Sequence, residues 1–186
     1  FVVQNFVYPS VRYQQVYGAS DFYAGHTGPQ FLITEISFVW GGGNSFFAFS
    51  GRLDIVQITF STTQKQPDGL SGVFSDNGGP DEAVAFSGAR QFTVTHGSDY
   101  GLQISLQERF LYDPTLGNLL LDVRNFQTVP PPPDGGKWLF LTDDKLGNTV
   151  SQAWAPDVNA TSARYVDTEG LLTRFTVTPI PEPRTS

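Results

Sequence analysis

The chain has 186 residues, a formal net charge of −7 at pH 7 and no cysteine or methionine. This length suits one domain, and the lack of cysteine excludes disulfides, thiolate nucleophiles and cysteine-ligated metal centres. The basic residues do not cluster, so we predict no nucleic-acid or anionic-membrane partner. No run of eighteen apolar residues occurs, and we therefore predict no transmembrane segment in the mature chain.

The N-terminal sequence FVVQNFVYPS is apolar, β-branched and aromatic. It could form an ordinary first strand of its own domain, or an extension that pairs with a sheet edge of a neighbouring subunit. Repetition of that head-to-tail contact would build an open filament. The donor-strand candidates are Phe1, Val2, Val3, Phe6, Val7 and Tyr8.

A hydrophobic period of two dominates the body of the chain. VQITFS places Val56, Ile58 and Phe60 on one face of a strand, and the segments at 102–107 and 173–178 alternate in the same way. LLLDVRNF is apolar almost throughout, as expected of a central strand. About ten such segments, separated by Gly, Pro, Asn and Asp clusters, predict an all-β fold. We expect an antiparallel, jelly-roll-like sandwich of two sheets.

Helical signals are nearly absent. In DGLSGVFSDNGG, Asp68 could cap a single turn that carries Leu70, Val73 and Phe74, so we expect at most one short helix. The proline run at 129–136 predicts a stiff surface loop.

Catalytic patterns are weak. HGSD at 96–99 brings His, Ser and Asp together, but neighbours on one turn cannot converge as a triad around an oxyanion hole. We interpret His26 and His96 as loop residues. A glycosidase needs only two carboxylates at a suitable separation, yet acidic surface residues are the simpler interpretation of the eighteen present. We therefore predict that the protein is not an enzyme.

One turn is rich in oxygen ligands. SDNGGPDE at 75–82 carries Asp76, Asn77, Asp81 and Glu82, which could bind calcium, the one cofactor that the sequence suggests. An Asx-rich turn without metal accounts for the same residues.

Two further features concern sugars. Asn159-Ala160-Thr161 matches the acceptor pattern for N-glycosylation. Trp40, Trp138 and Trp154 could stack on sugar rings, although tryptophan is more often a core residue.

The C-terminal Pro181-Glu182-Pro183 follows a threonine-rich strand and a short spacer. It resembles the opening of the PEP-CTERM sorting signal of exported bacterial proteins. Over residues 11–183, six segments resemble, in order, those of an uncharacterised PEP-CTERM β-domain: VRYQQVYGASDF, ITEISFVW, VQITFSTT, DGLSGVFSDNGGPDEAV, ERFLYDPTLGNLLLDVRNF and GLLTRFTVTPIPEP.

The resemblance implies export through a signal peptide in a Gram-negative-type bacterium and association with the extracellular matrix or exopolysaccharide. Processing by an exosortase is also implied, and no catalytic residue is supplied. In the family a hydrophobic helix and a basic cluster follow the Pro-Glu-Pro, whereas this chain stops at Ser186. We therefore expect a processed, released form, and the missing initiator methionine suggests that a signal peptide was removed.

These features predict three parts: an N-terminal extension (1–10), a single β-sandwich domain (11–178) and a remnant of the sorting signal (179–186). Our functional hypothesis is a secreted structural protein that self-assembles into an extracellular filament or biofilm matrix by β-strand complementation or edge pairing. Its partners would be copies of itself and the processing enzyme. The alternative is an exopolysaccharide-binding module at the cell surface.

Overall fold

The computed structural model describes residues 2–3, 10–23, 29–39, 49–94, 100–126, 140–143 and 148–180, and for residues 2–3, 49, 94, 100 and 140–143 it describes the backbone alone. Within these ranges the helices are two short 3₁₀ turns, η1 (Ala19–Phe22) and η2 (Phe74–Asp76). The strands are β1 (Val2–Val3), β2 (Val11–Tyr17), β3 (Phe31–Val39), β4 (Phe49–Thr63), β5 (Ala83–Val94), β6 (Tyr100–Tyr112), β7 (Asn118–Asn125), β8 (Phe140–Asp143), β9 (Val150–Ala155), β10 (Tyr165–Asp167), β11 (Gly170–Leu171) and β12 (Thr173–Pro179).

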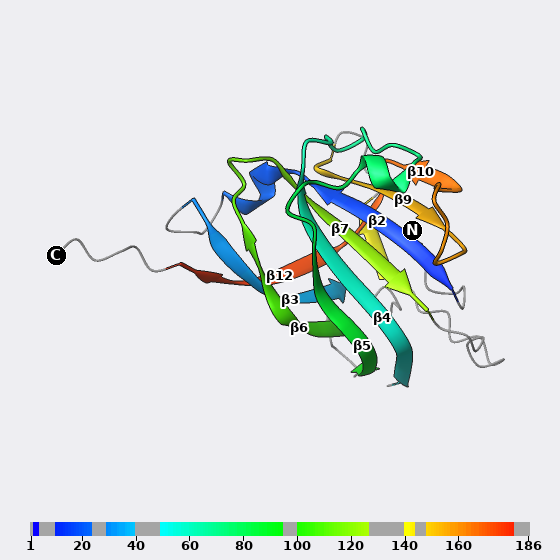
Figure 1. Ribbon diagram of the computed structural model, residues 1–186. Helices are drawn as coiled ribbons and strands as arrows, with labels where there is room; N and C mark the ends of the chain where they lie inside the picture. The colour runs from blue at the N-terminus through cyan, green and yellow to red at the C-terminus, as the bar shows by residue number, and fades with distance from the viewer. Residues whose placement is uncertain are drawn as a thin grey trace.

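Two antiparallel sheets pack face to face as a sandwich (Figure 1). The large sheet has six strands in the order β10-β9-β2-β7-β4-β5, and the small sheet has three in the order β12-β3-β6. A third, short ladder joins β1, β8 and β11. The prediction of an all-β, antiparallel two-sheet sandwich is confirmed.

The core lies between the two sheets, where the alternation of the sequence predicts it. Val56, Ile58 and Phe60 of β4 are buried, and they face Leu102 and Ile104 of β6 across the sandwich. The apolar strand β7 lies between β2 and β4, so its predicted central position is also confirmed.

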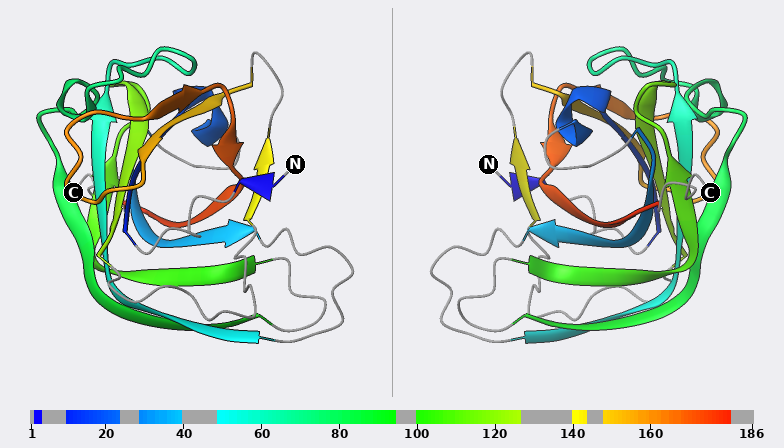
Figure 2. Two further views of the ribbon diagram at one scale, coloured as in Figure 1. Left: turned by 90° about the vertical axis from the view of Figure 1, so that its right-hand side faces the viewer. Right: turned by 90° about the vertical axis from the view of Figure 1, so that its left-hand side faces the viewer.

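The small sheet has different neighbours at its two ends (Figure 2). On one side β5 of the large sheet runs beside β6 of the small sheet, and Arg90 Nε donates to the Gln103 carbonyl (2.8 Å). On the other side the small sheet ends at β12, which pairs with β3 alone. The small sheet therefore has one joined end and one end that stops at an edge strand.

A loop covers the outer face of the large sheet. This covering loop, residues 64–82, lies over β2 and β7, where Leu70 and Phe74 pack on Val16 and Leu120 in a second hydrophobic cluster. Polar side chains hold it in place, because Asn77 Nδ2 donates to Gln14 Oε1 (2.9 Å).

The predicted cap of this loop is wrong. Asp68 lies in the left-handed region (φ 64°), and the 3₁₀ turn η2 begins after Val73 with no side-chain cap. The Asp68 N–H instead donates to Ser151 Oγ (2.9 Å). The turn forms later in the segment because Phe74 must reach the apolar surface of the sheet.

Candidate functional site: an open strand edge and its groove

The side of β12 turned away from β3 has no neighbouring strand in the described part of the chain. We call it the open edge. Val39 N donates to Leu172 O (3.0 Å) and Thr34 Oγ1 donates to Thr176 O (3.0 Å), so the even-numbered residues direct their backbone groups toward β3. Hydrogen-bonding direction alternates along a strand. The N–H and C=O groups of Thr173, Phe175 and Val177 therefore point to the open edge, with which no described strand pairs.

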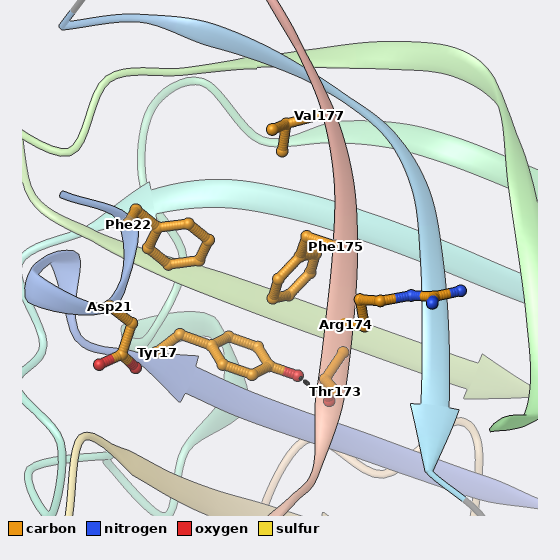
Figure 3. Close-up of a pocket in the computed structure, with 7 residues that line it drawn as sticks. All are labelled: Tyr17, Asp21, Phe22, Thr173, Arg174, Phe175 and Val177. Carbon is orange, nitrogen blue, oxygen red and sulfur yellow. Dashed lines mark hydrogen bonds between the residues drawn. The ribbon is translucent and has the colours of Figure 1, made fainter. Parts of the chain in front are cut away.

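A groove of about 350 Å³ follows this edge (Figure 3). We call it the edge groove, and its lining residues are Tyr17, Asp21, Phe22, Thr173, Arg174, Phe175 and Val177. Three of these rings pack together, since the Phe175 ring lies 4.9 Å from that of Tyr17 and 5.5 Å from that of Phe22. The groove thus has an aromatic floor between β12 on one side and η1 with the end of β2 on the other.

A buried glutamine marks where the open edge begins. Leu171 N donates to Gln15 Oε1 (2.7 Å), and Gln15 Nε2 donates to Leu171 O (3.0 Å). The amide of Gln15 therefore satisfies Leu171 as the peptide of a neighbouring strand would. Gly170 permits this close approach, because a Cβ there would lie 3.1 Å from Gln15 Cδ and 2.7 Å from Val150 Cγ2.

Burial shifts the pKa values of two ionisable groups that line the edge groove. Burial raises the pKa of the Tyr17 phenol, which stays protonated and donates to Thr173 Oγ1 (2.8 Å). Burial also raises the pKa of the Asp21 carboxyl, and the hydrogen bond from Thr149 Oγ1 (2.7 Å) opposes that shift. Asp21 is the one carboxyl among the described lining residues.

The structure describes only part of the predicted donor strand. The backbone of Val2 and Val3 pairs antiparallel with β8 of the same chain, in the register Val2↔Leu141 and Val3↔Phe140. This is the pairing within one chain that the sequence leaves open as an alternative. Other predicted residues lie outside the described ranges: Phe1, Phe6, Val7, Tyr8, His26, Trp40, His96, Trp138, Pro181, Glu182 and Pro183.

Side-chain oxygens of the oxygen-rich turn at 75–82 accept hydrogen bonds from nearby groups of the same chain. Asn77 Oδ1 accepts from Ser71 N (2.7 Å), Asp76 Oδ2 accepts from Ser71 Oγ (3.2 Å), and Asp81 Oδ1 accepts from Thr62 N (2.7 Å). Within the described ranges no group of three or more His, Asp or Glu side chains, those of Asp81 and Glu82 included, is placed to hold a metal ion. The arrangement is that of a turn stabilised by side-chain amide and carboxylate acceptors.

The sugar-related residues lie on the surface near β9 and β10. Asn159 is exposed in a turn, where its N–H donates to Asp157 Oδ1 (2.9 Å). Trp154 stacks on Tyr165 with a ring separation of 4.8 Å, and Tyr165 is 46% exposed. Tyr13, Trp154 and Tyr165 are register partners, so they form an aromatic row that runs from the core to the edge of the large sheet.

Sequence reasoning missed the edge groove. Its signal was present in the alternation of Phe175 and Val177 with polar residues, which predicts a half-buried strand but not that one edge lacks a neighbour. Comparison with models of known protein families, with curated proteins and with solved structures found no match to this chain. None of the helices in the described ranges has the length and apolar character needed to cross a membrane.

Proposed function

We propose that this protein is a non-enzymatic structural protein that assembles with copies of itself through the open edge of β12. The observation that supports this best is the open edge of the small sheet, whose three described strands face six in the large sheet. The side of β12 with which no described strand pairs coincides with the edge groove. A strand added there would pair with the outward backbone groups of Phe175 and Val177 and cover the aromatic floor.

The assembly would be an open polymer. A strand donated by one copy to the edge of the next is a heterologous contact, which propagates unless a rotation closes it into a ring. With the resemblance of Pro181-Glu182-Pro183 to a sorting signal, we propose that assembly takes place outside the cell, after export and exosortase-type processing, in a filament or biofilm matrix.

The test is a charge placed on the open edge. Val177 lines the edge groove and packs partly against the core, so Val177→Lys puts an ammonium group into the groove that the added strand would cover, as inward-pointing charges do on protected edge strands. We expect the wild type to form filaments in electron micrographs and the variant to stay monomeric with an unchanged circular dichroism spectrum. The matched control is Val166→Lys on β10, a strand residue that is 48% exposed and lies away from the groove. Filaments of folded Val177→Lys protein would contradict the proposal.

A second candidate function, binding of exopolysaccharide, is favoured by the aromatic row. The stacked pair of Trp154 and Tyr165 gives the edge of the large sheet an exposed ring, and the Arg164 guanidinium lies 5.3 Å from the Tyr165 ring centre. Aromatic rings with one exposed face suit contact with sugar rings.

A glycan array distinguishes this candidate from self-assembly. Binding that is lost in Tyr165→Ala or in the Trp154→Ala and Trp138→Ala variants, and is kept in Val166→Ala, would support a carbohydrate-binding module. Binding unaffected by these aromatic substitutions would remove the aromatic row as the site.

A further inference from the structure

We infer that the strand which fills the edge groove is the N-terminal segment Phe1–Tyr8 of a second copy, inserted as a single extended segment. This inference rests on the proposed function and deepens it by naming the donor. It can fail while self-assembly through β12 remains correct, because other segments or partners could occupy the same edge.

The walls of the edge groove favour binding of a single extended segment over binding of a folded sheet edge. Phe22 and Asp21 of η1 and Tyr17 of β2 stand opposite β12, on the side away from β3 (Figure 3). An added strand lies about 4.8 Å from its neighbour. It must therefore pass between β12 and η1. The edge of a second folded sandwich carries its own opposing sheet into that space, whereas an extended segment carries only its side chains.

The chemistry of the edge groove matches the N-terminal segment. The floor consists of the rings of Tyr17, Phe22 and Phe175, and Val177 extends it along β12. Phe1–Tyr8 has no charged side chain and five residues of the Phe or Val type. Burial of such side chains against aromatic rings is favourable, and no side chain of the segment brings a charge into the groove.

The C-terminal residues are poor donors by the same criteria. The segment at 181–186 contains Pro181 and Pro183, which have no N–H to donate to β12, and the charged Glu182 and Arg184. The proline run at 129–136 is excluded for the same reason.

The lengths of the two strands also agree. β12 has seven residues, and Gln15 already satisfies the backbone at Leu171, so the available edge begins at Thr173. The stretch from Val2 to Tyr8 has the same length as β12. In its own chain the two described residues of this segment, Val2 and Val3, pair with β8. Transfer to a neighbour would replace the pairing of Val2 and Val3 with β8 by pairing along β12.

A synthetic peptide tests the donor directly. The labelled decapeptide FVVQNFVYPS is titrated with the full chain, kept below its assembly concentration, and fluorescence anisotropy reports binding. We expect saturable binding to the wild type and to Val166→Lys, and binding weaker by at least about tenfold to Val177→Lys. A peptide with Phe6→Asp is the matched control for the donor, and we expect it to bind at least about tenfold more weakly than the native peptide.

Electron microscopy of a chain without residues 1–10 separates the two proposals. Loss of filaments, together with groove-dependent peptide binding, supports the donor assignment. Filaments that persist without residues 1–10 but disappear in Val177→Lys would overturn the donor assignment and leave self-assembly through β12 intact. Peptide binding that is equal in Val177→Lys and wild type would also overturn it. Filaments in both variants would contradict the proposed function itself.

Discussion

The outer face of the large sheet and the open edge of β12 differ in whether the chain itself covers them. On the outer face of the large sheet, residues 64–82 supply both the apolar side chains and the hydrogen-bonding partners that the sheet requires. At β12, the backbone groups of Phe175 and Val177 face a groove and no described strand. The first surface is covered by its own chain, whereas in the described part of the chain the second has no neighbouring strand.

The two regions also differ in the free energy that their polar groups contribute to folding. Beneath the covering loop, Asp122 accepts from Arg12 Nη2 (2.8 Å) and from Gln14 Nε2 (2.7 Å), with both charged side chains largely buried. Removing one member of such a pair leaves a buried charge without its partner. Among the described residues no strand pairs with the backbone groups at the open edge, and water can satisfy these groups. Substitutions should therefore affect stability in the first region and association in the second.

The largest expected effect is the loss of Arg12. Arg12→Ala should lower the free energy of unfolding by about 3–5 kcal/mol, because Asp122 stays buried without its guanidinium and Phe74 loses its cation–π contact. The matched control is Arg52→Ala, which removes an exposed ion pair with Asp54 and should cost at most about 1 kcal/mol. Urea unfolding measures both values. Equal losses in the two variants would show that the covering loop is not held by this buried pair.

A smaller loss is expected from Asn77→Ala. The substitution leaves Gln14 Oε1 and the Ser71 N–H without their partner, which should cost about 1–3 kcal/mol. Asn159→Ala, on an exposed turn, should change the free energy of unfolding by less than about 0.5 kcal/mol. Urea unfolding with and without millimolar calcium also tests the turn as a metal site. Calcium-dependent stabilisation that Asn77→Ala abolishes would show that the turn binds the ion.

The smallest expected effect concerns Asp21 in the edge groove. Its carboxyl has a raised pKa through burial, so the folded state holds this proton more tightly than the unfolded state. The associated stability is present in acid and is lost as pH rises through the raised pKa. Asp21→Asn should remove this dependence and stabilise the chain slightly at neutral pH. Thermal melts across the acidic range measure the effect, and an unchanged pH profile would contradict it.

The sequence predicts the strands well because their chemistry is local. The alternation of Val56, Ile58 and Phe60 places them correctly in the core, and LLLDVRNF is a central strand as expected. The same alternation does not predict where a loop covers the outer face of a sheet. Thr59 and Ser61 alternate with the core residues of β4, yet both are buried, and the covering loop crosses the outer face of their sheet.

The candidate site could not be predicted because it depends on strand order. Nothing in LLTRFTVT indicates that β12 ends a sheet, nor that Tyr17 and Phe22, over 150 residues away in the sequence, form the opposite wall. The cap at Asp68 failed for a related reason, since tertiary packing of Phe74 decides where the turn forms.

Hydrogen exchange of the β12 amides tests the central claim most directly. In dilute protein, we expect the N–H groups of Arg174 and Thr176, which face β3, to be protected and those of Phe175 and Val177 to exchange rapidly. On assembly, Phe175 and Val177 should become protected by at least about tenfold while Arg174 and Thr176 change little. If Phe175 and Val177 are already protected in the dilute protein, or still exchange rapidly in filaments, the open edge is not where the copies join.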